Sequence, residues 1–107
     1  MKRLLWIGSS KQDVLSFPVG ARRNAGYQLD KVQRGEEPDD WKPMPSVGPG
    51  VREIRIHVEG AFRVLYVANI GDAIHVLHAF QKKTQKTPLR DVRLARQRLS
   101  LLEGERT

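Results

Sequence analysis

Alternating apolar and polar residues in the second half of the chain predict three β-strands. The runs VREIRIH (51–57), AFRVLYV (61–67) and AIHVLHAF (73–80) alternate over much of their length and are rich in β-branched and aromatic residues. Turn-forming sequences separate them, VEG at 58–60 and NIGD at 69–72. The pattern therefore predicts an antiparallel meander over residues 51–80.

The first half of the chain carries patterns typical of one strand and two helices. An apolar run over residues 4–7 predicts a strand, after which Ser9 or Ser10 can cap a short helix that runs to about Phe17. Pro18 suits the first turn of a second helix, which Gly35 ends. Residues 36–50 hold four of the six prolines and predict a loop.

A final helix is predicted after the meander, with Thr87 as its N-cap and Pro88 at its first position. Its apolar stripe consists of Val92, Ala95, Leu99 and Leu102. The element order is then β-α-α-β-β-β-α. We therefore predict a single α+β domain over residues 1–107, in which an N-terminal helical pair and a C-terminal helix cover one face of an antiparallel sheet.

The turn at 58–60 determines which residues face each other in the first hairpin. A three-residue loop with Gly60 in the left-handed conformation places Arg55 opposite Arg63. One face is then apolar and consists of Ile54, Ile56, Phe62, Val64 and Tyr66. Arg55, Arg63 and His57 lie on the other face with Glu53. A two-residue loop would mix arginine and isoleucine on each face, so the hydrophobic pattern favours the three-residue loop.

Two arginines that face each other repel unless a negative charge lies between them. One interpretation is that Glu53 or Glu59 screens them on a solvated face of the sheet. The other is an anion site, because paired guanidinium groups match phosphate oxygens in bidentate geometry.

The charge of the chain favours a polyanionic partner. The net charge is +7, which points to nucleic acid first and to an acidic protein or a membrane surface second. Residues 82–98 hold seven basic residues against one acid, Asp91, and so carry +6 of this charge. The basic residues are Lys82, Lys83, Lys86, Arg90, Arg93, Arg96 and Arg98. A solvated helix face is the ordinary explanation, but the shortage of acids favours a surface that meets RNA phosphates or an acidic partner.

Several kinds of site and compartment are disfavoured by composition. The chain has no cysteine, which excludes disulfides and thiolate metal sites and indicates the cytoplasm. Its apolar runs are too short to span a membrane. His57, His75 and His78 lack a nearby carboxylate motif, so we expect no metal and no cofactor. His78 alternates with Val76 and Phe80, a pattern typical of a histidine on a core face.

Several long stretches of the chain are characteristic when taken together: GVREIRI, GAFRVLYV, IHVLHAFQKKTQKTP and DVRLARQRL, with DWKPMPSVGPGV and WIGSSKQDVLSFP before them. They resemble the phage-derived, HigB-like branch of the RelE/ParE toxin superfamily. The resemblance implies a small RelE-like α+β fold with a concave basic sheet. It also implies a toxin encoded beside a helix-turn-helix antitoxin, its partner. Many members of this superfamily cleave mRNA on translating ribosomes.

The resemblance also implies roles for individual residues. The arginine of the superfamily's YR-hydrophobic-hydrophobic-Y strand matches Arg63, and the basic residue of the preceding strand matches Arg55. The basic residue after the last strand falls at Lys82 or Lys83. Some members carry a catalytic tyrosine or histidine near the C-terminus, but neither residue type follows His78 here. That role is either absent or taken by His78, His57 or a lysine.

These observations lead to a hypothesis of metal-independent RNA cleavage. The RNA 2′-hydroxyl attacks the adjacent phosphate, Arg55 and Arg63 stabilise the added charge, and Lys82 or Lys83, with a pKa lowered by neighbouring cations, moves a proton. The residues expected to bind RNA are Arg52, His57, Lys86, Arg90 and Arg93. The leading function is a ribosome-dependent mRNA endoribonuclease toxin of a type II toxin-antitoxin system. The alternatives are a ParE-like toxin that binds a protein such as DNA gyrase, and a plain RNA-binding module.

Overall fold

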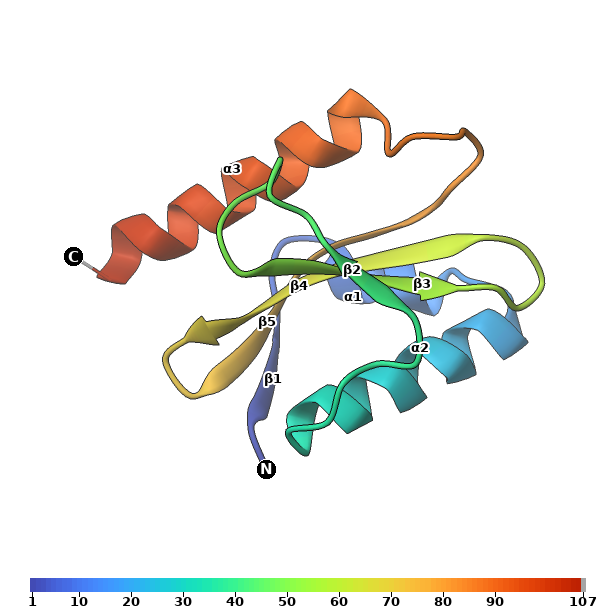
Figure 1. Cartoon of the computed structure of the whole chain (residues 1–107), viewed down its shortest axis with the longest axis horizontal. Coiled ribbons are helices and arrows are strands. Elements are labelled where there is room, and N and C mark those ends of the chain that lie inside the picture. The colour runs from blue at the N-terminus through green and yellow to red at the C-terminus, as the bar shows by residue number, and fades with distance from the viewer. Residues whose placement is uncertain (107) are drawn as a thin grey trace.

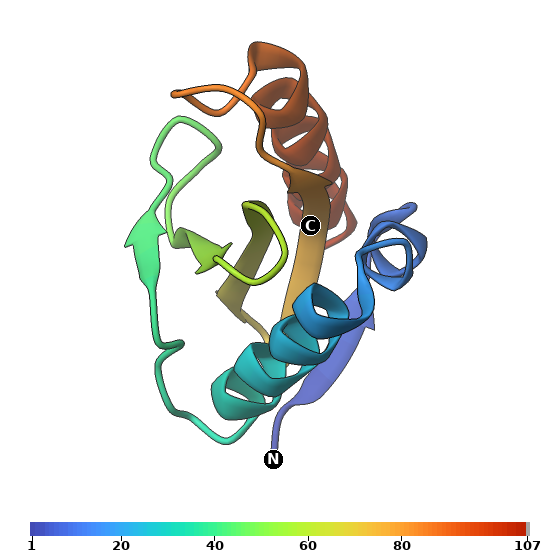
Figure 2. The same cartoon turned by 90° about the vertical axis from the view of Figure 1, so that its right-hand side faces the viewer.

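Helices cover both faces of one five-stranded β-sheet (Figures 1 and 2). The computed structural model describes residues 1–106, and side chains up to residue 104. The strands are β1 (Arg3–Trp6), β2 (Trp41–Pro43), β3 (Val51–Ile56), β4 (Phe62–Ile70) and β5 (Ala73–Gln81). The helices are α1 (Ser10–Leu15), α2 (Val19–Gln33) and α3 (Leu89–Arg106). The predicted α+β order is confirmed, with β2 as an addition.

The prediction that all helices share one face of the sheet was wrong. Helices α1 and α2 pack on the face that carries Val64 and Tyr66, whereas α3 packs on the face that carries Leu65 and Val67. The reason lies in β4, where every residue from Phe62 to Val67 is buried and all but Arg63 are apolar. A strand that is apolar on both sides needs a cover on both sides.

The sheet order is β1-β5-β4-β3-β2. Strands β3, β4 and β5 form the predicted antiparallel meander. Strand β1 instead runs parallel to β5, with Arg3 beside Ala73 and Trp6 beside Val76. Strand β2 lies within the predicted loop and pairs with the outer side of β3. Pro43 is tolerated there because an edge strand leaves one row of backbone groups unpaired.

The predicted hairpin register is confirmed. Arg55 faces Arg63, and Ile56 faces Phe62. Gly60 has a positive φ of 129°, and Glu59 also has a positive φ, 58°. The Glu59 carboxylate accepts a hydrogen bond of 2.7 Å from the backbone N–H of Gly20, in the first turn of α2. Glu59 therefore neutralises a helix N-terminus.

The helix ends agree with the sequence in one case and depart from it in another. Gly35, at φ 84°, ends α2 in a Schellman motif: its N–H bonds to Val32 O, and that of Glu36 bonds to Lys31 O. At the start of α3 the carbonyl of Pro88 accepts the first helical bond, from Val92 N–H. The predicted N-cap, Thr87, turns its hydroxyl to the sheet instead.

A β-bulge in β5 changes the expected environment of His78. Leu65 faces His78 while Tyr66 faces Val76, so Leu77 is an extra residue in β5. Val76 packs on the α1–α2 side, whereas Leu77 packs on the α3 side. The predicted alternation of His78 with Val76 is therefore broken, and His78 lies with Leu65 on the α3 side. Among the described helices, none is long and apolar enough to cross a membrane.

Candidate functional site

The centre of the candidate site is the pair Arg55 and Arg63, on the sheet face that α3 covers in part. Arg63 is 5% exposed, and its Nη1 donates a hydrogen bond of 2.9 Å to Phe62 O. The Nε atoms of both arginines are buried and have no hydrogen-bond partner among the described residues. Burial lowers the pKa of Arg63, against the raising effect of the Glu53 carboxylate. Two guanidinium groups with unused donors are a suitable place for an anion.

Glu53 lies in the same cluster and is completely buried. Its Oε1 is 3.6 Å from Arg63 Nε and 3.9 Å from Lys42 Nζ. Its Oε2 accepts a hydrogen bond of 3.0 Å from Thr87 Oγ1. Glu53 therefore does place a negative charge beside the arginines, but on a buried surface and not on the solvated face that one interpretation required.

Of the two lysines predicted to move a proton, Lys82 is the one on which the charges of Arg55 and Arg63 act. The backbone N–H of Lys82 donates a hydrogen bond of 2.8 Å to Ala61 O. This bond continues the β4–β5 ladder by one residue beyond β5, and it holds Lys82 beside Arg55 and Arg63. Burial lowers the pKa of Lys82, and the charge of Arg63 lowers it further, partly against Glu53. Lys42 and Arg55 also lower it. Lys83, the next residue, is exposed in the segment that leads to α3.

His78 lies apart from this cluster, beneath the start of α3. It is 6% exposed, and its Nε2–H donates a hydrogen bond of 2.7 Å to the carboxylate of Asp91 in the first turn of α3. Its other nitrogen, Nδ1, is buried without a hydrogen-bond partner among the described residues. The His78 ring stacks on Phe80, with centroids 5.2 Å apart. The pair of His78 and Asp91 attaches the helix to the sheet.

Two residues predicted to bind RNA lie outside the arginine cluster. Arg52 pairs with Tyr66 on the α1–α2 face and stacks on the ring of Trp41 at 4.0 Å. His57 is exposed just beyond β3, where its Nε2 is 2.7 Å from Asp40 Oδ2. Each side chain already has a partner, and Arg52 lies on the opposite side of the sheet from Arg63.

The remaining predicted residues follow the end of β5. Lys86 is exposed in the loop between β5 and α3, and its carbonyl accepts a hydrogen bond of 2.6 Å from Thr84 Oγ1. Arg90 and Arg93 are exposed on the first turns of α3. Figure 1 shows this loop rising from the end of β5 to the start of α3. The structure thus places an exposed basic segment directly after the buried cluster.

Three residues that complete these sites were not predicted as site residues. Lys42 faces Glu53 across β2 and β3, but the loop prediction for residues 36–50 concealed that pairing. Thr87 was expected to cap a helix, and Asp91 was noted only as the single acid of a basic segment. Within the described part of the chain, no group of three or more histidine, aspartate or glutamate side chains could hold a metal ion.

Comparison with known families agrees with this architecture. The model of the family described as phage-derived, Gp49-like protein matches residues 12–100. The chain belongs to this family. Gp49-like proteins are related to the RelE-type toxins, so the broad resemblance is confirmed, while the HigB-like branch stays a prediction. No curated protein matches the chain.

Proposed function

We propose that this Gp49-like protein is the toxin of a type II toxin-antitoxin system and cleaves mRNA on the ribosome. The observation that carries the proposal is the direct pairing of Arg55 with Arg63. The Nε atoms of both arginines have no hydrogen-bond partner in the described part of the chain, and Glu53 Oε1, 3.6 Å from Arg63 Nε, supplies a single negative charge. Like charges at paired positions destabilise a sheet, and a bound phosphate would relieve that repulsion.

The proposed reaction is an internal transfer within the RNA. The 2′-oxygen attacks the adjacent phosphorus, the bond to the 5′-oxygen breaks, and the products are a 2′,3′-cyclic phosphate and a 5′-hydroxyl. The attack requires removal of the 2′-hydroxyl proton and protonation of the leaving 5′-oxygen. Arg55 and Arg63 stabilise the negative charge that develops on the phosphorane oxygens.

Lys82 is the residue we assign to proton transfer. Its lowered pKa increases the fraction of free amine at neutral pH, which a general base needs. His78 is less suitable, because Asp91 occupies Nε2 and the protein covers Nδ1. We assign His78 a structural role, and we assign Lys83, Lys86, Arg90 and Arg93 to contacts with RNA phosphates.

We further propose that a helix-turn-helix antitoxin, encoded by a neighbouring gene, is the protein partner. The exposed basic residues after β5 favour an acidic antitoxin segment laid over them. The complex should then weaken as salt is added, because exposed charges are screened.

The test is induction of Arg63→Ala in growing cells, beside Arg63→Lys and wild type. Arg63→Ala should abolish growth inhibition and codon-linked cuts in a reporter mRNA, while antitoxin binding persists. Arg63→Lys keeps the charge but lacks the guanidinium fork, so it should retain only part of the activity. The matched control is Arg23→Ala, an exposed arginine on α2.

Undiminished toxicity of Arg63→Ala would contradict the proposal. DNA-damage signalling without mRNA cuts would instead identify a toxin of the gyrase-binding kind. RNA binding without any toxicity would identify a binding module.

A further inference from the structure

An aromatic ring continues the row of arginines across the sheet. Arg55 pairs with Arg63 across β3 and β4, and Arg63 pairs with Phe80 across β4 and β5. Paired residues of an antiparallel ladder point to the same side, so all three side chains lie on one face. Neighbouring strands are about 4.8 Å apart, so Phe80 lies about one strand spacing beyond Arg63. Its ring is held by stacking on His78 and is only partly buried.

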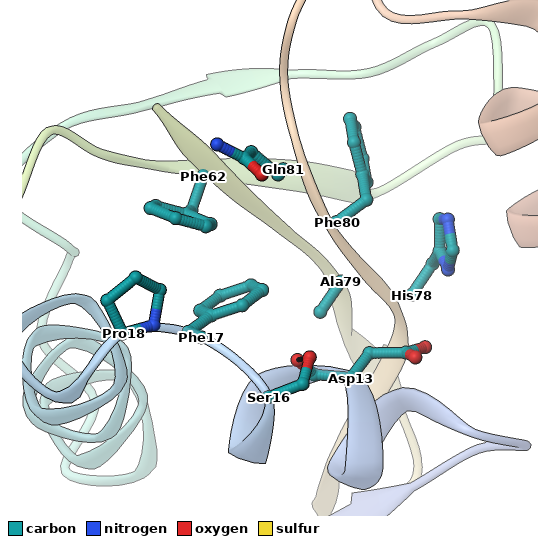
Figure 3. A pocket seen from close by; sticks show the side chains of 9 residues that line it. All are labelled: Asp13, Ser16, Phe17, Pro18, Phe62, His78, Ala79, Phe80 and Gln81. Atoms are coloured by element: carbon teal, nitrogen blue, oxygen red, sulfur yellow. Dashed lines mark hydrogen bonds between the residues drawn. The ribbon is translucent and has the colours of Figure 1, made fainter. Parts of the chain in front are cut away.

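A pocket of about 520 Å³ opens beside Phe80, between α1 and the last residues of β5 (Figure 3). Strand β1 pairs with β5 only as far as Val76, so it does not cover the later part of β5. The pocket therefore lies at the edge of the sheet: Phe80 reaches it from the α3 side, and Phe17 and Phe62, with ring centroids 4.5 Å apart, line it from the α1–α2 side. This volume is in the ordinary range of small-molecule sites.

The polar groups of the pocket suit a neutral base better than a phosphate. Asp13 contributes a carboxylate, of which Oδ2 accepts a hydrogen bond of 2.9 Å from Ser9 Oγ. A carboxylate repels phosphate but accepts hydrogen bonds from the amino groups of adenine, cytosine or guanine. Gln81 adds an exposed amide that can donate and accept.

We propose that Phe80 stacks on an RNA base next to the phosphate held by Arg55 and Arg63, and that this pocket receives the edge of that base. The inference rests on the proposed function and adds a base-stacking residue to it. Other proteins bind single-stranded RNA in this manner: basic side chains contact the phosphate backbone, and aromatic rings stack on the splayed bases. Phe80 therefore contributes affinity that does not depend on charge.

The test uses purified protein and a short RNA made non-cleavable by 2′-deoxy substitution, with 2-aminopurine at single positions. Phe80→Leu keeps an apolar side chain but removes the ring. It should weaken binding by about 5- to 150-fold, as expected for one lost base–aromatic stack. The dependence of log affinity on log salt concentration should keep its slope, because no ionic contact is lost. Arg63→Ala should instead reduce that slope by about 0.7 for each phosphate contact removed.

Fluorescence gives a second measurement that does not depend on the leucine variant folding. With wild-type protein, 2-aminopurine emission should fall at one position of the RNA and not at its neighbours. Phe80→Trp retains a stacking ring, so it should bind RNA as wild type does, and its added tryptophan emission should be quenched by RNA. Leu101→Ala, an exposed apolar residue of α3, is the matched control and should bind as wild type does.

Three results would overturn the inference. If a folded Phe80→Leu variant bound RNA with unchanged affinity while Arg63→Ala bound it more weakly, Phe80 would have no role in RNA binding. The proposed function would not be affected. No binding of this RNA by wild type would overturn the inference, whereas cleavage on the ribosome is judged separately by the cuts in the reporter mRNA. Loss of antitoxin binding in Phe80→Leu, with normal RNA binding, would show that the pocket receives a peptide.

Discussion

Thr87 Oγ1 donates a hydrogen bond of 3.0 Å to the buried carboxylate of Glu53, which joins the entry of α3 to the middle of β3. The two residues are 34 positions apart in the chain. This bond holds the end of the basic loop between β5 and α3 against the cluster formed by Glu53, Arg55 and Arg63.

Thr87→Val keeps the shape of the side chain but removes the hydroxyl. One oxygen of a buried carboxylate then loses its hydrogen bond, so the free energy of unfolding should fall by about 1–3 kcal/mol. Urea denaturation measures this change. Thr84→Val is the matched control, because the Thr84 hydroxyl bonds within the exposed loop, to Lys86 O. Equal stability of the two variants would contradict the role given to Thr87.

Glu53→Gln keeps the size of the side chain but removes its charge. Arg55, Arg63 and Lys82 then repel without compensation, so stability in a chloride buffer should fall by about 1–3 kcal/mol. Sulfate should restore part of this loss, because it offers the arginines the negative charge that the variant lacks. Thermal melts in sulfate and chloride at equal ionic strength measure the effect.

The control for this experiment is Glu36→Gln, which removes an exposed carboxylate paired with Arg34. Sulfate stabilises most proteins to some degree, so the relevant quantity is the additional rise in Glu53→Gln. The same rise in both variants would argue against an anion site at Arg55 and Arg63.

The amine of Lys82 should titrate at a lower pH than a free lysine. Burial and the charge of Arg63 disfavour its protonated form, so its pKa should lie below the usual value of about 10.4. NMR titration of ¹³C-methylated lysines measures this value directly. In Arg63→Ala the pKa of Lys82 should rise towards the usual value, and an unchanged pKa would show that the two side chains do not interact.

Asp91→Ala should loosen the first turn of α3. The variant leaves a 6%-exposed His78 without the acceptor of its Nε2–H, which should cost about 1–3 kcal/mol of unfolding free energy. Hydrogen exchange should also become faster at the start of the helix. Glu103→Ala, an exposed acid on the same helix, should leave both quantities unchanged. If Asp91→Ala were as stable as wild type, the pair of His78 and Asp91 would not be what attaches α3 to the sheet.

Stability should decrease in mild acid partly because of His75. Burial lowers the pKa of this histidine in the folded protein, and the charge of Arg3 adds to the effect. The unfolded chain therefore binds a proton more readily below about pH 6.5, so folding loses stability as the pH falls. The loss from this group is at most about 1.4 kcal/mol per pH unit.

His75→Gln removes this titration. Urea denaturation at about pH 7.5 and about pH 5.5 should therefore show a smaller loss of stability in the variant than in wild type. An identical loss in both proteins would assign the acid sensitivity to other groups.

Local pattern was sufficient for much of the fold. Gly60 and the alternation around it fixed the pairing of Arg55 with Arg63, because a shift by one residue would have exposed Ile54 and Ile56. Gly35 ended α2 as predicted, since a left-handed residue closes a Schellman motif. Both features depend on neighbouring residues alone.

Pairing between distant segments was not available from pattern. Strand β1 shows an apolar run but nothing that selects a parallel partner, and β2 is a short edge strand within a proline-rich stretch. The bulge at Leu77 reversed the predicted alternation of His78 with Val76, because one extra residue moves every later side chain to the other face.

Local sequence patterns were therefore enough to predict the types of most elements, the hairpin register, the facing arginines and the basic segment after β5. Only the tertiary structure placed α3 on the second face, buried Glu53 between Lys42, Arg63 and Thr87, joined His78 to Asp91, and opened the pocket beside Phe80. The division has a physical reason. Turns and periodicity act between residues a few positions apart, whereas burial and charge pairing depend on which distant segments pack together.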